Sequence, residues 1–363
     1  MRKGHPYGLH RVLDPPGAMP QPAWKLDNQP VCYDNELLID VERLSIDAAS
    51  FTQIRMEAND NPERVAAIMR RIVEERGKHH NPVTGSGGML VGRVAEIGSA
   101  LSTRVDVAVG ERIATLVSLS LTPLYLEDIV DIQMASGQVT VRGKAVLFET
   151  GIFAKLPEDI PEAVALAVLD VCGASAQTAR IVQPGQHVVV LGAGGKSGLT
   201  VLCQARRSAG NGRVVAVETS PEGQARIAQL GCADAVLAVD ATLPLEVMAA
   251  VEEALGGHLA DVVINCVNVP NTELSSILCA KEHGLVYFFS MATNFAAAAL
   301  GAEGVAKDVE LHIGNGYCRG HADHAIHLLR TTPELLRIFE EKVAASRTKD
   351  AEHLSTTLKE AAK

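Results

Sequence analysis

The second half of the chain alternates short apolar runs with segments in which apolar residues recur every three to four positions. Val188 to Leu191 is an uninterrupted apolar run typical of a buried parallel strand, and Leu199 to Ala209 has helical spacing. The same pattern predicts further strands at 235–239, 261–267 and 285–290, and further helices at 221–230, 245–255 and 271–281. Alternating strands and helices predict a doubly wound parallel sheet with helices on both faces.

The first 150 residues have a different pattern. Residues 36–46 and 92–113 contain short alternating strands punctuated by glycine, which predict an antiparallel barrel. Between them, an Asn61 cap followed by Pro62 predicts a helix that ends at Gly77. The tail from Pro333 mixes acidic and basic residues and predicts a solvated helix.

A glycine-rich turn directly follows the strand at 188–191. Its spacing is Gly192-x-x-Gly195-x-x-Gly198, with a further glycine at Gly194. A dinucleotide site needs such glycines because the backbone must bend sharply and bring free amides close to a pyrophosphate at a helix N-terminus. The predicted cofactor-binding residues of this turn are Gly192, Gly194, Gly195, Lys196, Ser197 and Gly198. A P-loop is excluded, because that motif needs a glycine where Val190 stands.

Glu218 closes the next apolar run, 20 residues after Gly198. A carboxylate at this position accepts hydrogen bonds from the adenosine ribose and repels a 2′-phosphate. Since Thr219 and Ser220 offer no arginine to bind that phosphate, the sequence favours NAD over NADP. Asn265, Ser290 and Thr293 follow later strands and are expected to contact the nicotinamide end, although caps of the strand ends are an equal alternative.

Composition limits the classes of partner. A length of 363 residues favours two domains, and the net charge of −10 without any basic run argues against nucleic acid or an anionic membrane as partner. Seven cysteines without paired spacing predict reduced core residues and a reducing, cytoplasmic location. We expect neither a signal peptide nor a membrane span, because polar residues interrupt the apolar stretch 285–302.

Three motifs resemble the medium-chain dehydrogenase/reductase superfamily: a Gly-x-Val pattern from Gly92 to Gly98, Val109 to Ile113, and Pro184-Gly185 before the first parallel strand. The resemblance implies an α/β chain with a GroES-like antiparallel β-barrel domain and a doubly wound Rossmann nucleotide-binding domain. It places the substrate and catalytic domain at 1–155, the NAD-binding domain at 156–315 and a return segment with a helical tail at 316–363. It also implies a homodimer.

Zinc-dependent members of the superfamily carry a cysteine, a Gly-His-Glu motif and a later Cys or Asp. Here Asp47 stands at the first position, Gly87-Gly88-Met89 replaces the second motif, and Cys172 alone matches the last. We therefore expect no metal site.

Longer blocks, among them residues 20–25, 45–54, 75–90 and 312–323, resemble the L-erythro-3,5-diaminohexanoate dehydrogenase family of bacterial lysine fermentation. The resemblance implies an oxidoreductase acting on a CH-NH2 group, which uses NAD to deaminate the diamino acid to 5-amino-3-oxohexanoate and ammonium. Two alternatives stay open: a zinc-independent quinone or enoyl reductase, and a catalytically silent nucleotide-binding protein on the same fold.

Oxidation of an alkylammonium requires a group that removes a proton first. Asp47, at the position of the lost metal ligand, is one candidate, with a turn cap as the alternative reading. Lys78 and His80 are the other predicted catalytic residues, although a surface loop also explains adjacent histidines. Ser50, Thr84 and Ser86 are the predicted substrate-binding hydroxyls.

Overall fold

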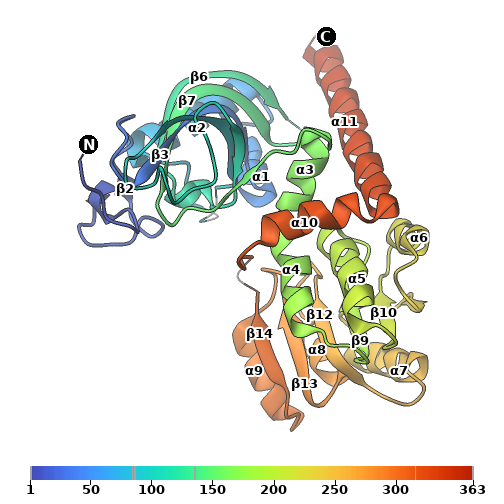
Figure 1. The fold of residues 1–363 in the computed structure, drawn as a ribbon. Coiled ribbons are helices and arrows are strands. Elements are labelled where there is room, and N and C mark those ends of the chain that lie inside the picture. The colour runs from blue at the N-terminus through green and yellow to red at the C-terminus, as the bar shows by residue number, and fades with distance from the viewer. Residues whose placement is uncertain (1, 84, 86, 135, 315, 362–363) are drawn as a thin grey trace. The chain divides into compact units, whose positions relative to one another are not determined.

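A computed structural model describes residues 2–83, 85, 87–134, 136–314 and 316–361. The chain divides into two compact units, residues 1–162 with 344–363, and residues 163–343 (Figure 1). Each unit is described by itself. The three-part division inferred from the sequence, with its own return segment from residue 316, stays a prediction.

A curved antiparallel sheet forms the first unit (Figure 1). Its strand order is β6-β7-β3-β4-β5-β8. The strands are β3 (Glu36–Ser45), β4 (Met89–Ile97), β5 (Arg112–Thr115), β6 (Leu124–Gln133), β7 (Gln138–Phe148) and β8 (Phe153–Lys155). A short hairpin of β1 (Val12–Asp14) and β2 (Lys25–Leu26) precedes them. The predicted strands at 36–46 and 92–113 are confirmed, whereas β6 and β7 were not anticipated.

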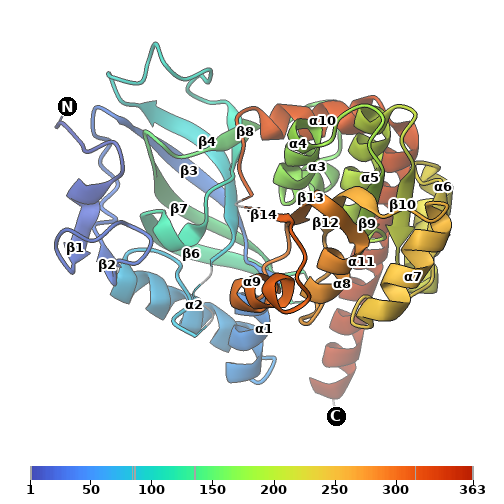
Figure 2. The same ribbon diagram turned by 90° about the horizontal axis from the view of Figure 1, so that it is seen from below.

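Two helices pack beside this sheet, α1 (Ala48–Glu57) and α2 (Pro62–Arg76) (Figure 2). Helix α2 has the predicted ends: the Asn61 side chain accepts a hydrogen bond from the Arg64 amide, and Gly77 closes the helix at φ +67°. Apolar side chains of α2 join the strand residues in one buried core. Helix α1 was not predicted, because its apolar residues do not follow one helical face.

A parallel sheet forms the second unit, with the strand order β11-β10-β9-β12-β13-β14. The strands are β9 (Val188–Leu191), β10 (Val214–Val217), β11 (Ala235–Leu237), β12 (Ala260–Asn265), β13 (Ala280–Phe288) and β14 (Glu310–Ile313). The central strands are buried on both faces, as their uninterrupted apolar runs predict. The predicted order of alternating strands and helices is confirmed.

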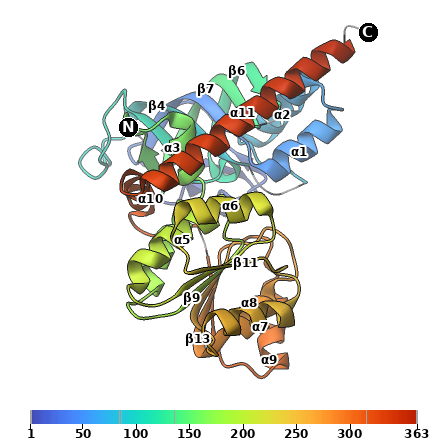
Figure 3. The same ribbon diagram turned by 90° about the vertical axis from the view of Figure 1, so that its right-hand side faces the viewer.

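Helices cover both faces of this sheet (Figure 3). One group comprises α4 (Cys172–Ile181), α5 (Lys196–Ala209) and α10 (His321–Arg330), and the other comprises α7 (Pro244–Ala254), α8 (Glu273–Cys279) and α9 (Phe295–Gly304). Helix α6 (Pro221–Leu230) packs against α5 and β11, and α3 (Glu162–Leu169) precedes α4. The predicted fold class, an antiparallel GroES-like barrel domain with a doubly wound Rossmann domain, is confirmed.

The final helix, α11 (Pro333–Ala361), begins where the sequence predicts. The prediction of a solvated helix is wrong for its first turns, because Leu335, Ile338 and Phe339 are buried. Within the described ranges, no single helix is both long and apolar enough to cross a membrane, and only the bent pair α3 and α4 meets that test jointly. The stretch 285–302 is split between β13 and α9.

Candidate functional site

The glycine turn joins β9 to α5 in the second unit. Gly192 adopts φ +70°, a conformation that side chains disfavour, and its amide donates to the carbonyl oxygen of Val217 at 3.0 Å. Gly195 is the N-cap of α5, so the first amides of this helix point toward the turn. A helix N-terminus with unpaired amides is a ready binding place for an anion.

The space for a side chain differs from one glycine of the turn to the next. A Cβ atom added at Gly198 would lie 2.3 Å from the carbonyl oxygen of Gly192, and one at Gly194 would lie 2.5 Å from Cα of Gly223. By contrast, a Cβ at Gly195 meets nothing nearer than 3.6 Å. The backbone is therefore packed tightly behind the turn and open beside Gly195, as a dinucleotide pyrophosphate requires.

Glu218 holds this turn in place. Its Oε2 accepts from the Gly194 amide at 2.9 Å, and its Oε1 accepts from the amide and hydroxyl of Ser220 at 2.9 and 2.8 Å. These charge-assisted bonds fix the carboxylate at the end of β10, where a cofactor ribose binds in this fold.

Two cations near Glu218 escaped the sequence analysis. Arg226, on α6, donates from Nε to the carbonyl oxygen of Gly194 at 3.1 Å. Lys342, on α11, interacts electrostatically with Arg226, Lys196 and Glu218, and its pKa is lowered by burial and by the two cations. Nothing in the local spacing signals either residue, because tertiary packing alone brings them to the turn.

The other predicted cofactor residues have partners within the protein. Lys196 pairs with Asp170, and the carbonyl of Ser197 accepts from the hydroxyl of Thr200. The Asn265 amide donates to Thr272 and Ser276 and accepts from the amide of Val267. The hydroxyl of Ser290 accepts from the amide of Ala292, and the Thr293 amide donates to the Ser290 carbonyl. The bonds of Asn265 and Ser290 match the capping alternative for strand-end residues, and direct cofactor contacts of all these side chains stay predictions.

In the first unit, Asp47 is the N-cap of α1. Its Oδ1 accepts from the Ser50 amide at 2.9 Å, so the turn-capping role is real. This role uses one carboxylate oxygen and leaves the carboxylate charge in a half-buried position. Ser50 is buried, and its carbonyl accepts from the side chain of Asn81.

Lys78 and His80 face groups other than Asp47. The Lys78 ammonium is buried and donates to the carbonyl oxygens of Pro20 and Gln21 at 2.7 and 2.9 Å, while burial and then Arg76 lower its pKa to about 7. Nδ1 of His80 lies 3.3 Å from the Arg76 guanidinium. Burial and the charge of Arg76 lower the pKa of His80 to about 4. Their catalytic roles stay predictions.

His79, which the sequence offers beside Lys78 and His80 but does not single out as a catalytic residue, is the histidine on which the charge of Asp47 acts. Its side chain is 0% exposed, and neither ring nitrogen has a hydrogen-bond partner among the described residues. Burial lowers the pKa of His79 to about 4, and the Asp47 carboxylate opposes that shift. The imidazole is therefore neutral and close enough to Asp47 to interact with its charge.

Gly87 and Gly88 allow this proximity. A Cβ atom at Gly87 would lie 2.5 Å from the carbonyl oxygen of His79, and a Cβ at Gly88 would lie 2.9 Å from the Asp47 nitrogen. The pair thus packs against both segments and brings them together. Thr84 and Ser86, the predicted substrate hydroxyls, lie outside the described residues.

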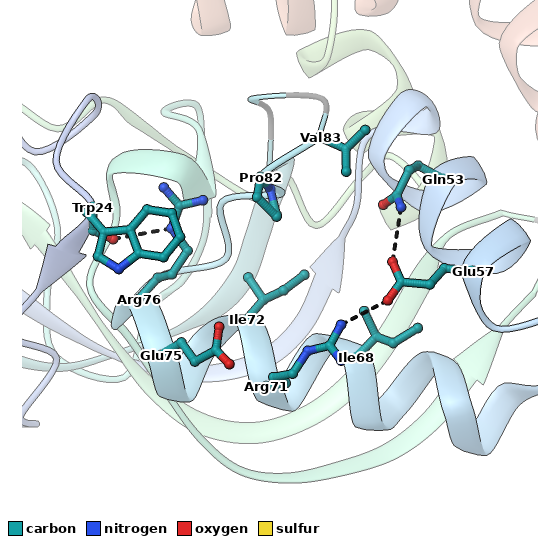
Figure 4. A pocket seen from close by; sticks show the side chains of 10 residues that line it. All are labelled: Trp24, Gln53, Glu57, Ile68, Arg71, Ile72, Glu75, Arg76, Pro82 and Val83. Carbon is teal, nitrogen blue, oxygen red and sulfur yellow. Dashed lines mark hydrogen bonds and ion pairs between the residues drawn. The ribbon is translucent and has the colours of Figure 1, made fainter.

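A cavity of about 280 Å³ is lined by side chains of α1 and α2 and by Pro82 and Val83 (Figure 4). Three of its charged side chains have partners: Glu57 accepts from Gln53 and Arg71, and Arg76 stacks on the ring of Trp24 at 4.3 Å (Figure 4). A charged ligand that bound Glu57, Arg71 or Arg76 would have to displace these partners.

No three His, Cys, Asp or Glu side chains gather as a metal site would require in the part of the chain that the structure describes. Cys172 lies within the packed start of α4, where burial raises the pKa of its thiol to about 12. A high thiol pKa opposes the thiolate that a metal would need.

Comparisons with known proteins cover almost the whole chain. Residues 10–157 match the model of the L-erythro-3,5-diaminohexanoate dehydrogenase N-terminal domain, and residues 198–304 match that of zinc-binding dehydrogenases. A protein from Acetoanaerobium sticklandii named L-erythro-3,5-diaminohexanoate dehydrogenase is 51% identical over 342 residues, which cover 94% of this chain and 99% of that protein. One of the same name from Fusobacterium nucleatum subsp. nucleatum has the same identity and coverage.

The chain belongs to the L-erythro-3,5-diaminohexanoate dehydrogenase family. The family resemblance expected from the sequence is thereby confirmed. A mycobacterial protein solved in complex with NADPH has a TM-score of 0.54 and 17% identity, covering 88% of this chain and 91% of its own. At that identity the likeness supports the fold alone. The fold of this diaminohexanoate dehydrogenase family is therefore the medium-chain dehydrogenase/reductase fold.

The unequal packing around the glycines gives a matched pair of variants. We expect Gly198→Ala to lower the free energy of unfolding by about 1–3 kcal/mol, because a backbone carbonyl blocks the new methyl group. Gly195→Ala should leave the unfolding midpoint unchanged and weaken dinucleotide binding, since its methyl group enters the open space. Thermal unfolding and NADH fluorescence titration measure both effects. Equal stability of the two variants would contradict this account of the turn.

Proposed function

We propose that this chain is an NAD-dependent L-erythro-3,5-diaminohexanoate dehydrogenase of lysine degradation. The observation that carries the proposal is 51% identity along 99% of two relatives that bear this name. In the reaction, the diamino acid with its 3-ammonium group, NAD⁺ and water give 5-amino-3-oxohexanoate, NADH, ammonium and a proton. The reductase alternative is not favoured, since the NADPH-bound neighbour shares only the fold.

NAD, rather than NADP, is the proposed cofactor. Both oxygens of Glu218 are fixed by the turn, which places a negative charge where an NADP 2′-phosphate would need a positive one. Arg226 and Lys342 would favour NADP, since their positive charges would attract the 2′-phosphate. The carboxylate prevails in this proposal because it lies at the end of β10, the position that contacts the cofactor ribose in this fold.

The cofactor, when bound, supplies the hydride acceptor. The contribution of the protein is to prepare the substrate nitrogen, because hydride leaves only from carbon that bears a neutral amine. Asp47 is the proposed base: its carboxylate pairs with the 3-ammonium group, breaks one N–H bond and accepts the proton. After hydride loss the same carboxyl group can return a proton while water adds to the imine carbon and ammonia departs.

Three further features belong to the proposal. Catalysis needs no bound metal, since the carboxylate and the substrate charge supply the proton chemistry. The protein acts in the cytoplasm, as seven free cysteines support. It forms a homodimer, for which the edge strand β14, with Ile313 60% exposed, offers a surface.

The proposed reaction can be measured directly as NADH absorbance. With 3,5-diaminohexanoate and NAD⁺ we expect NADH formation that survives prolonged chelation, whereas common amino acids and simple alcohols should give none. Activity on alcohols without activity on the diamine would reject the proposal. Activity lost on chelation and restored by zinc would reject its metal-free part.

Asp47→Asn tests the proposed base. Asn is also a good N-cap, so helix α1 should keep its start and the unfolding midpoint should stay near that of the wild type. Loss of the charge removes a charge-assisted bond of about 1.5–3 kcal/mol, and we therefore expect kcat/KM for the diamine to fall by roughly tenfold or more. Affinity for NAD should be unchanged. A fully active variant would leave Asp47 as a cap alone.

Glu218→Gln tests the choice of cofactor, because it keeps an acceptor oxygen and removes the charge. We expect the ratio of kcat/KM for NAD over NADP to fall by roughly tenfold or more. The double variant Glu218→Gln, Arg226→Ala is the matched control, since without the guanidinium the gain with NADP should disappear. A wild-type protein that prefers NADP by about tenfold would contradict the assignment of Glu218.

A further inference from the structure

The imidazole of His79 is the feature that the proposed base does not explain. A neutral imidazole has one N–H donor and one acceptor nitrogen, and both are fully buried here without a partner among the described residues. Unpaired buried polar groups are costly, and a leucine or phenylalanine would fill the same space without that cost. Groups retained at such a cost are typical of functional sites.

The surroundings of His79 leave Asp47 as the charged group that acts on the ring. On the same segment, the Lys78 ammonium is held by the carbonyls of Pro20 and Gln21, and His80 faces Arg76. From the loop before β4, the Gly87 carbonyl lies near the ring and favours its protonated form less strongly than the Asp47 carboxylate does. The acidic neighbour therefore comes from the N-cap of α1.

We propose that His79 is a positioning residue that acts through Asp47 by donating its ring N–H to that carboxylate during the reaction. This inference rests on the proposed function. The bond would keep the carboxylate aimed at the 3-ammonium group. When the substrate N–H bond breaks, the proton forms an O–H bond on Asp47, the C3–H electron pair leaves as hydride to NAD⁺, and His79 stays neutral throughout.

A substitution without hydrogen-bonding atoms separates this role from core packing. For His79→Leu we expect an unfolding midpoint equal to or above that of the wild type, because two unpaired polar atoms are removed. At the same time kcat for the diamine should fall by roughly tenfold or more, with KM for NAD unchanged. The pH profile of kcat/KM should also differ from that of the wild type, a change that loss of core packing alone would not cause.

Two conservative variants and one control complete the test. His79→Asn and His79→Gln each carry an amide donor, near the place of Nδ1 or Nε2, and one of them should recover part of the activity and of the pH profile. His321→Leu removes another buried histidine, on α10, and should leave the pH profile unchanged.

Each outcome decides the inference. A His79→Leu variant with wild-type kcat and pH profile would overturn it, as would an activity loss that follows lost stability and is recovered by neither amide variant. Retained stability with lost activity, recovered by Asn or Gln, would support it. A wild-type protein that forms no NADH from the diamine would overturn the proposed function, and this inference with it. An active wild type with a fully active His79→Leu variant would overturn the inference alone.

Discussion

Burial of the polar segment 78–81 is the constraint on which the first unit depends. Lys78, His79 and Asn81 are all fully buried, and a buried polar group needs a partner to avoid a large desolvation cost. Lys78 meets this need by binding the carbonyl of Pro20, and Asn81 by binding that of Ser50. The same bonds that satisfy the segment therefore tie both the N-terminal chain and α1 to the segment that carries His79.

Sequence patterns predicted the second unit well and the first unit less well. The strand at 188–191, its glycine turn and the Ser220 cap of α6 depend on local signals that any such turn or helix start must carry. Strand β7 pairs with β3, which is distant in sequence, and β6 pairs with β7 at the edge of the sheet. A local pattern does not report the pairing of β7 with β3. The apolar residues of helix α1 do not gather on one face, so the Asp47 cap is the only sequence feature that marks this helix.

The candidate site shows a similar division. Asp47 and Glu218 could be selected because a superfamily position or a fixed spacing marks them. The choice among Lys78, His79 and His80 could not be made, because the segment is irregular and no period dictates where each side chain points. In the folded chain the charge of Asp47 acts on His79, whereas His80 lies beside Arg76.

The backbone at Gly88 limits how a metal ligand could be introduced into this protein. The superfamily resemblance places it at the histidine of the Gly-His-Glu motif of zinc-dependent members, yet its φ is +107° and an added Cβ would lie 2.1 Å from the carbonyl oxygen of Ser45. A single Gly88→His substitution therefore cannot reinstate that ligand, because the backbone itself occupies the space for the side chain. A ligand side chain at this position requires a different backbone path at Gly88, so the two kinds of site differ in backbone shape as well as in side chains.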